Sequence, residues 1–203
     1  MAKKPKILAF AGSLRKDSYN KRVVKVAIEG AEKGGAEVTY IKLEDNPLPV
    51  YNEDEHKGEG FPENAKKLQK IFGEHDGFLI SSPEYNASLP GGMKNVFDFV
   101  SRKSEDYEMI EVFKGKAAAI MTASPGSFGG IRCLGHLRGV LSIMLTSVLP
   151  TEIAVGGVHK MFEGDSEEMQ DEKMKKLLQD LGKSLSDILK QTHGEIEVAD
   201  NAG

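Results

Sequence analysis

The fold of this chain is decided by the stretch Ala11-Gly12-Ser13-Leu14-Arg15-Lys16-Asp17-Ser18-Tyr19-Asn20, which joins two different sequence patterns. Before it, residues 7–11 form a short apolar run typical of a buried strand, and after it apolar residues recur at helical spacing. A strand that turns at a glycine and enters a helix leaves unpaired backbone N–H groups at the helix N-terminus, where an anion is favoured. This arrangement predicts a phosphate-binding loop.

The side chains of this loop fit phosphate. Ser13, Ser18 and Asn20 offer neutral donors, and Arg15 offers a planar fork for two phosphate oxygens. One arginine among neutral groups suits a single terminal phosphate better than a chain of phosphates. A monophosphate ester is therefore the predicted ligand, and the alternative is a polar loop that only caps the helix.

Two common phosphate loops do not fit these residues. A nucleoside triphosphate loop needs Gly-Lys where Asp17 and Ser18 stand. The dinucleotide pattern needs glycine two residues after Gly12, where Leu14 stands. The sequence therefore argues against both of these nucleotide classes.

Composition limits the remaining possibilities. The 203 residues suit one domain, residues 1–203, and 27 basic against 31 acidic side chains give a net charge of −4, which excludes a nucleic-acid surface. No apolar run is long enough for a signal peptide or a membrane span, so we expect a cytoplasmic protein without membrane contact. The single cysteine, Cys133, permits no internal disulfide or cysteine-rich metal site, and with His136 we interpret it as a packed residue.

Short apolar or β-branched runs alternate with helical patterns along the chain. Strands are predicted at residues 7–11, 37–42, 76–82, 116–122 and 151–155. Between and after them, helical spacing runs over residues 23–31, 65–72, 93–100, 134–145 and 174–189. Two helical faces carry the predicted core contacts, Leu134, Leu137, Leu141 and Leu145 in one, and Met174, Leu177, Leu178, Leu181, Leu185, Ile188 and Leu189 in the other.

This alternation predicts an α/β fold, a flavodoxin-like three-layer sandwich. Its five-stranded parallel sheet is expected in the order 2-1-3-4-5 with helices on both faces. Ligands of such sheets bind beyond the carboxyl ends of the strands, where the strand order reverses. The polar segments 82–95 and 124–130 follow the third and fourth strands, so we expect both to face the phosphate loop and to form one site with it.

Two motifs resemble the NAD(P)H-dependent FMN reductase family, which includes quinone, chromate and azo-dye reductases. The first is Gly-Ser-Leu-Arg-x-x-Ser-x-Asn at residues 12–20, and the second is Pro-Glu-Tyr-Asn-x-Ser-x-Pro-Gly-x-x-Lys-Asn at residues 83–95. The resemblance runs from about Lys6 to Val155. Phe99 departs from the pattern, because relatives often carry Trp there.

The resemblance implies a cofactor site and a reaction. FMN is the implied cofactor, with NADPH or NADH as co-substrate, and the flavin rather than a catalytic side chain or a metal carries the chemistry. NAD(P)H stacks on the flavin and gives a hydride to N5, and a quinone, a flavin or a similar small acceptor then takes the electrons. The implied cofactor-binding residues are Ser13, Arg15, Ser18, Tyr19 and Asn20 for the phosphate, and Pro83, Glu84, Tyr85, Asn86, Ser88, Ser124 and Gly126 for the ring.

The long Pro-containing segment 43–62 resembles a loop that contacts a partner subunit in relatives, which implies a homodimer or homotetramer. The alternative is a mobile surface loop.

Arg102 is expected to meet nucleotide phosphates, a neighbouring subunit or only solvent. For Tyr85 the alternative is an aromatic that only fills space, and for Glu84 it is a carboxylate that faces solvent.

Two other functions are weighed against the reductase. A flavodoxin-type FMN electron carrier shares the expected fold, but such carriers have a Ser/Thr-rich phosphate loop without Arg15 and are usually more acidic. A hydrolase on an α/β sheet would need a Gly-x-Ser-x-Gly elbow, which the sequence lacks.

Overall fold

The computed structural model describes residues 4–55 and 60–200, with side chains up to residue 192. Its sheet is parallel and contains β1 (Lys6–Ala11), β2 (Glu37–Lys42), β3 (Gly77–Ser81), β4 (Ala117–Ser124), β5 (Ser147–Val148) and β6 (Ile153–Gly156). The strands lie in the order β2-β1-β3-β4-β5, with β6 also paired to β4. The predicted order 2-1-3-4-5 and the flavodoxin-like fold are confirmed.

The fifth position of the sheet is divided between two short strands. β5 pairs with Ala117 and Ala118 at the start of β4, and β6 pairs with residues 121–124 at its end. Pro150 lies between the two pieces and has no N–H to donate to a ladder, which accounts for the break. The predicted strand at 151–155 corresponds to β6, and the sequence analysis missed β5.

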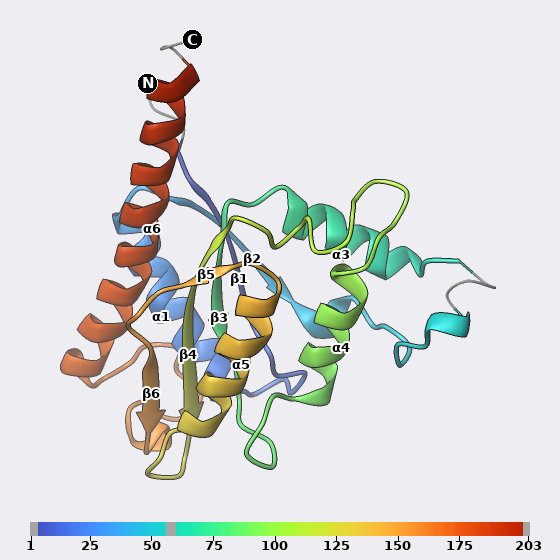
Figure 1. Cartoon of the computed structure of the whole chain (residues 1–203). Helices are drawn as coiled ribbons and strands as arrows, with labels where there is room; N and C mark the ends of the chain where they lie inside the picture. Colours follow the sequence, from blue (N-terminus) through green and yellow to red (C-terminus); the bar gives the residue numbers. More distant parts are fainter. Residues whose placement is uncertain (1–3, 56–59, 201–203) are drawn as a thin grey trace.

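Helices cover both faces of the sheet (Figure 1). One face is covered by α1 (Tyr19–Lys33) and the long C-terminal α6 (Glu172–Asp200). The other face is covered by α3 (Glu63–Gly73), α4 (Gly91–Val100) and α5 (Ile131–Ile143). Two short 3-10 turns, η1 (Leu43–Asp45) and η2 (Val158–Lys160), follow β2 and β6.

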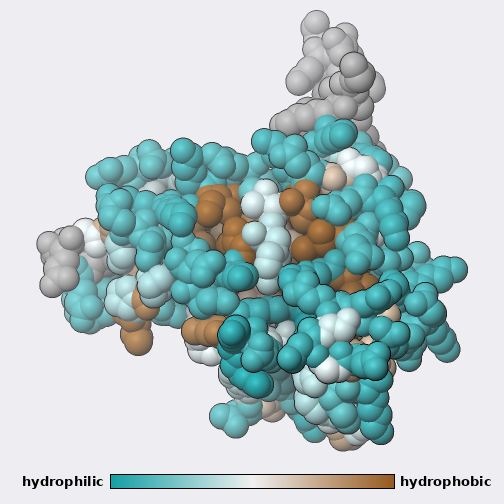
Figure 2. All heavy atoms as spheres, turned by 180° about the vertical axis from the view of Figure 1, so that it is seen from behind, coloured by the Kyte–Doolittle hydropathy of each residue, from teal (hydrophilic) through white to brown (hydrophobic). Residues whose placement is uncertain are grey.

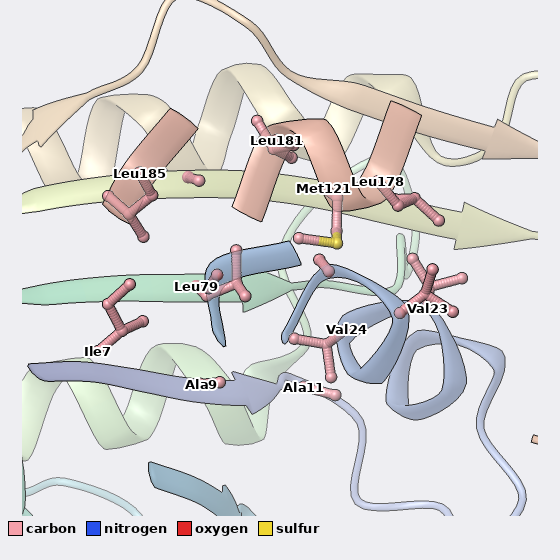
Figure 3. Packing of buried hydrophobic residues seen from close by; sticks show 14 of the residues in the cluster. Ile7, Ala9, Ala11, Val23, Val24, Leu79, Met121, Leu178, Leu181 and Leu185 are labelled. Atoms are coloured by element: carbon pink, nitrogen blue, oxygen red, sulfur yellow. The ribbon is translucent and has the colours of Figure 1, made fainter. Parts of the chain in front are cut away.

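Alternation along β1 divides the core into two layers. Ile7, Ala9 and Ala11 point into the layer under α1 and α6, and Figure 3 shows them in one cluster with Val23 and Val24 of α1 and the leucines of α6. Leu8 and Phe10 point into the opposite layer under α3, α4 and α5. All five side chains are buried, as expected for a central strand of a sheet that is covered on both sides.

Two glycines let α1 and α6 approach each other closely. A Cβ on Gly30 would lie 1.9 Å from the carbonyl oxygen of Gln179, and a Cβ on Gly182 would lie 1.9 Å from that of Ala27. Any larger residue at either position would push the two helices apart. The C-terminal helix is therefore part of the core packing.

Three predicted core residues lie at the surface. Leu145 is 53% exposed with φ +61°, because α5 ends at Ile143 and the chain turns through the left-handed region. Leu177 and Ile188 of α6 are 45% and 38% exposed, since they flank a narrower buried stripe. That stripe contains Leu178, Leu181, Leu185 and Leu189.

The edge of the sheet opposite β5 and β6 is formed by β2. β2 pairs only with β1, and its four middle residues are half-buried. Seen from behind, most of the surface is hydrophilic, with apolar side chains gathered in the middle of the face (Figure 2). In the described residues no helix is long and apolar enough to cross a membrane.

Candidate functional site

Three loops converge at the carboxyl end of the sheet (Figure 1). They are the β1 loop (residues 12–18), the β3 loop (residues 82–88) and the β4 loop (residues 125–130). Sheet-like hydrogen bonds continue into their first residues, because the Gly12 N–H donates to Ser81 O (2.8 Å) and the Ser82 N–H donates to Met121 O (2.9 Å). The loops therefore leave the sheet side by side, as their sequence positions predicted.

The β1 loop presents buried hydroxyls and an exposed cation. Ser13 and Ser18 are 1% and 5% exposed, and the Ser13 hydroxyl accepts a hydrogen bond from the Arg15 N–H (3.3 Å). The Arg15 side chain is exposed, and within residues 4–55 and 60–200 it makes no ion pair. Its guanidinium is thus available to an anion.

The N-terminus of α1 completes this cradle. Ser18 stands at the N-cap but makes no side-chain cap hydrogen bond, and the first turn of α1 contains no acidic residue. A loop that only capped the helix would use that side chain on the backbone, so the capping alternative is not supported. The positive end of the helix dipole and Arg15 can act on the same bound anion.

Asn20 joins the three elements behind the cradle. Its Oδ1 accepts hydrogen bonds from the Ser81 hydroxyl (2.8 Å) and the Ala123 N–H (2.9 Å), and its Nδ2 donates to Ala123 O (2.9 Å). The residue is 3% exposed. Asn20 therefore fixes the start of α1 against the ends of β3 and β4.

The β3 loop turns sharply at its outer end. Tyr85 and Ser88 exchange two backbone hydrogen bonds of 3.0 Å, and the residues between them, Asn86 and Ala87, have φ angles of 50° and 63°. Two successive positive φ angles define a type I′ turn, which Asn tolerates and Ala adopts at some cost. Tyr85 is 46% exposed, so it does not serve to fill the core.

A carboxylate joins the β3 loop to α5. The Glu84 Oε2 accepts the N–H groups of Arg132 (2.9 Å) and Cys133 (3.3 Å), and its Oε1 lies 3.1 Å from the Arg132 guanidinium. These N–H groups belong to the first turn of α5, so Glu84 caps a helix from another segment of the chain. The side chain is 14% exposed, and the alternative that Glu84 faces solvent is wrong.

Two further side-chain contacts support the same connection. The Cys133 thiol donates to the Ser82 hydroxyl (3.2 Å), and the His136 Nδ1 lies 2.8 Å from the Ser88 hydroxyl. Cys133 is buried, as interpreted from the sequence, and burial raises the pKa of its thiol. His136 is exposed, so its interpretation as a packed residue is wrong: it lies on the face of α5 that meets the β3 loop.

The β4 loop is built on glycine. Gly129 and Gly130 have φ angles of 63° and 88°, and a Cβ on Gly129 would lie 2.7 Å from the Gly156 nitrogen. The Ser124 hydroxyl accepts the Gly126 N–H (3.1 Å) and so shapes the start of the loop. Its backbone can therefore approach a planar ligand without interfering side chains.

In the described residues the charged side chains of the site are Arg15, Lys16 and Asp17 of the β1 loop, all exposed, and the Glu84–Arg132 pair. Within the described part of the chain, no three His, Cys, Asp or Glu side chains gather in a way that could hold a metal. A cluster of neutral donors, a helix N-terminus and one free guanidinium fits the phosphate of a planar cofactor. The turn at residues 85–88 and the glycines of the β4 loop lie at the same end of the sheet as this cradle.

Comparison with known proteins agrees with this geometry. The NADPH-dependent FMN reductase family matches residues 5–160, which is most of the chain. The chain belongs to this family. It is an NAD(P)H-dependent FMN oxidoreductase, and its cofactor is FMN, which supplies a ring that accepts and donates hydride when bound.

Similar proteins include named reductases of comparable length. A quinone reductase of Escherichia coli K12 is 34% identical over 158 residues, which is 78% of this chain and 80% of that protein. An NAD(P)H-dependent FMN reductase of Pseudomonas aeruginosa is 34% identical over 176 residues, with 86% and 89% covered. The structure of FerB, a flavoenzyme NAD(P)H:(acceptor) oxidoreductase from Paracoccus denitrificans, matches with a TM-score of 0.77 and 29% identity over 92% of this chain and 98% of that one.

The sequence analysis of this reductase missed the residues of α5 that position the β3 loop. Arg132 and Cys133 lie 48 and 49 residues after Glu84, and no local pattern links them to it. Two sequence features together could have indicated this contact. One is the acidic residue Glu84 in a predicted loop, and the other is a helix, α5, that starts after a glycine and has no acidic residue in its first turn.

Proposed function

We propose that the reductase holds the FMN phosphate on the β1 loop and the flavin ring between the β3 and β4 loops. Ser13, Arg15 and Ser18, with Tyr19 beside them, bind the phosphate, and Asn20 positions that loop through β3 and β4. The single observation that carries this proposal is the exposed Arg15 above buried hydroxyls at an uncapped helix N-terminus.

The ring is assigned to the two remaining loops. The flavin ring is lined by Pro83, Tyr85 and Asn86. The β3 loop is held on α5 by Glu84 and Ser88. Ser124 and Gly126 close the other side. Backbone N–H groups directed at the polar edge of the ring stabilise the negative charge of its reduced form, so no side chain needs to transfer a proton.

The acceptor is proposed to be a quinone, a free flavin or a similar small molecule. Relatives are named quinone reductase, NAD(P)H:quinone oxidoreductase and FMN reductase, which supports this class.

We further propose that the whole chain acts as one FMN-binding domain, which the close packing of α6 on α1 supports. A cytoplasmic location accords with its use of NAD(P)H.

A homodimer or homotetramer is proposed to form through segment 43–62. Asn95 of α4 holds this segment, since its Oδ1 accepts the Tyr51 N–H (2.9 Å) and its Nδ2 donates to Pro49 O (2.7 Å). Val50 between them is 85% exposed, so residues 49–51 present an apolar side chain on a backbone held by Asn95. Residues 56–59 of the segment lie outside the described residues. Gel filtration tests the proposal: Val50→Glu should shift a dimer towards the monomer, and a wild-type monomer would refute it.

One experiment separates the reductase from a flavodoxin-type carrier. The FMN-loaded protein is mixed with NADPH or NADH without oxygen, and the absorbance of the bound flavin is followed. A reductase loses the absorbance quickly and regains it when a quinone is added. Flavin that stays oxidised would favour the carrier, and failure to bind FMN would refute both.

A further inference from the structure

Two cavities meet beside the β1 loop, and of the residues assigned to FMN above only Ser18 lines either of them, in the larger one. The smaller cavity, here called the slot, has a volume of about 220 Å³. Its walls are mainly apolar, and its lining includes Leu14, Leu48, Gly92 and Val96 as well as Glu44 and Asn46. The larger cavity, here called the basic pocket, has a volume of about 350 Å³ and shares Leu14 and Glu44 with the slot.

Two side-chain oxygens in the walls of the slot are buried and have no hydrogen-bond donor among the described residues. Asn46 is 5% exposed, and its Oδ1 has no partner among the described residues; the same holds for Glu44 Oε2. The Asn46 amide donates only a long hydrogen bond to Lys42 O (3.4 Å). Buried acceptors without donors are costly and need an explanation. Because the terminal torsions of Asn and Glu are broad, a small rotation turns either oxygen towards a donor in the slot.

The unpaired oxygens restrict the chemistry of an occupant. A metal ion is disfavoured, because Lys21 already pairs with the other oxygen of Glu44. The remaining amide in the slot, Asn95, uses its oxygen on Tyr51 and its nitrogen on Pro49. A flat apolar group with an N–H₂ substituent would meet both free acceptors and the apolar walls.

The basic pocket supplies positive charge next to the slot. Among its lining residues, Lys21, Arg22 and Lys25 pair with acidic side chains. Lys16 and Lys42 also line it, and in the described part of the chain neither makes an ion pair. Three of the four acidic residues that line the pocket are the partners of these paired cations, and the fourth is Asp17. The pocket therefore has one more basic than acidic residue, and the two ammonium groups beside an apolar slot fit a phosphate attached to a flat ring.

We propose that the slot and the basic pocket together bind an adenosine phosphate, namely the adenosine end of NAD(P)H. The adenine amino group has two N–H donors for Asn46 and Glu44, the purine packs against Leu14 and Val96, and a phosphate lies near Lys16 and Lys42. Leu14 lies between Ser13 and Arg15, so the co-substrate is held on the outer side of the loop that holds FMN. The inference rests on the NAD(P)H dependence of the reductase.

Asn46→Leu tests the proposal, because a binding role and a structural role predict opposite signs. Replacing an unpaired buried amide by an apolar side chain of similar size should leave the melting temperature unchanged or raise it. If Asn46 binds adenine, the same variant should raise the KM for NADPH by about tenfold, with kcat and FMN content unchanged. Gln191→Leu, on the exposed surface of α6 and outside the slot, is the matched amide control and should change neither.

Direct titration with 2′,5′-ADP and with 5′-AMP supplies the second measurement. Both should bind the FMN-loaded protein, compete with NADPH, and bind more weakly to Asn46→Leu. Lys42→Glu should weaken 2′,5′-ADP more than 5′-AMP if the pocket takes the 2′-phosphate. Binding without competition would show a site for a free nucleotide and would overturn the assignment to the co-substrate.

Two results would refute the site. One is that neither nucleotide binds although NADPH still reduces the flavin, which leaves the reductase function intact. The other is that Asn46→Leu lowers the melting temperature and leaves the KM for NADPH unchanged. Failure of NADPH to reduce the flavin in the wild-type protein would instead contradict the reaction itself.

Discussion

The two ends of the sheet bury polar groups of different kinds. At the carboxyl end the loops of the site rest on buried neutral side chains, which include Ser13, Asn20 and Ser81. At the amino end half-buried charged groups are held by the chain itself: the Lys116 Nζ donates to Phe72 O (2.5 Å) and Gly73 O (3.1 Å), and the Asp76 carboxylate accepts the Lys6 N–H (2.7 Å). The amino end thus satisfies its own charges, whereas the carboxyl end leaves charge to be supplied by the ligand.

The largest expected effect concerns Asn20, the main neutral connector of the carboxyl end. Asn20→Ala removes the partners of the Ala123 N–H and C=O and of the Ser81 hydroxyl in a buried place. We expect the free energy of unfolding to fall by about 3 kcal/mol, and FMN affinity to fall with it. Urea denaturation of the apoprotein measures this. Gln191→Ala on the exposed surface of α6 is the control, and equal midpoints for both variants would contradict the role of Asn20.

Arg15 tests whether the ligand supplies the charge at this end. Arg15→Ala should weaken FMN binding by about 10- to 100-fold, because a charge-assisted fork to phosphate is lost, while the stability of the apoprotein stays the same. Flavin fluorescence titration gives the affinity. Arg15→Lys keeps the positive charge but lacks the planar guanidinium, so its FMN affinity should lie between those of the wild type and Arg15→Ala. An unchanged FMN affinity in Arg15→Ala would contradict the assignment of the phosphate to this loop.

Glu84 sharpens the comparison, because it is a charged group at the carboxyl end that the protein itself neutralises. Glu84→Ala removes the cap of α5 and should lower the free energy of unfolding by about 1 kcal/mol. Glu84→Gln keeps an acceptor for the two N–H groups, so its free energy of unfolding should fall by less than half as much as that of Glu84→Ala. Thermal unfolding with and without FMN distinguishes the variants, and a larger loss in Gln than in Ala would contradict capping.

The last expected effect is confined to alkaline pH and concerns the pH dependence of stability at the amino end. Burial lowers the pKa of Lys116 from 10.5 to about 8. Between these values the unfolded chain binds a proton that the folded chain does not, so this residue makes stability rise with pH over that window. Denaturant unfolding of wild type and Lys116→Met at pH 7.5 to 10 measures the difference. A wild-type curve that rises no more than that of the variant would contradict the assignment.

The elements of the fold were predictable where the signal is local. The strand at 7–11, the glycine turn and the helical spacing after it lie within one short stretch, and the structure reproduces them. β5 was missed because two residues carry no periodicity, and Leu145 was misplaced because helical spacing continues past the residue where α5 ends.

The same distinction holds for the site. The three loops were predictable from motif and topology, since each follows directly from a strand. The capping of α5 by Glu84, the contact of Ser88 with His136 and the role of Asn20 depend on residues 48 to 103 positions apart. Sequence patterns of a single chain carry no information on such pairs, because they arise only when the sheet is assembled.

The divided fifth strand has a consequence for how copies of the protein can meet. β5 has two residues and β6 has four, with Pro150 between them, so an approaching strand finds no long row of free N–H and C=O groups on that side. Intact sheet edges are templates for aggregation and for strand exchange between molecules. The break makes this edge a poor template, in contrast to the β2 edge, which pairs only with β1 and runs unbroken over six residues.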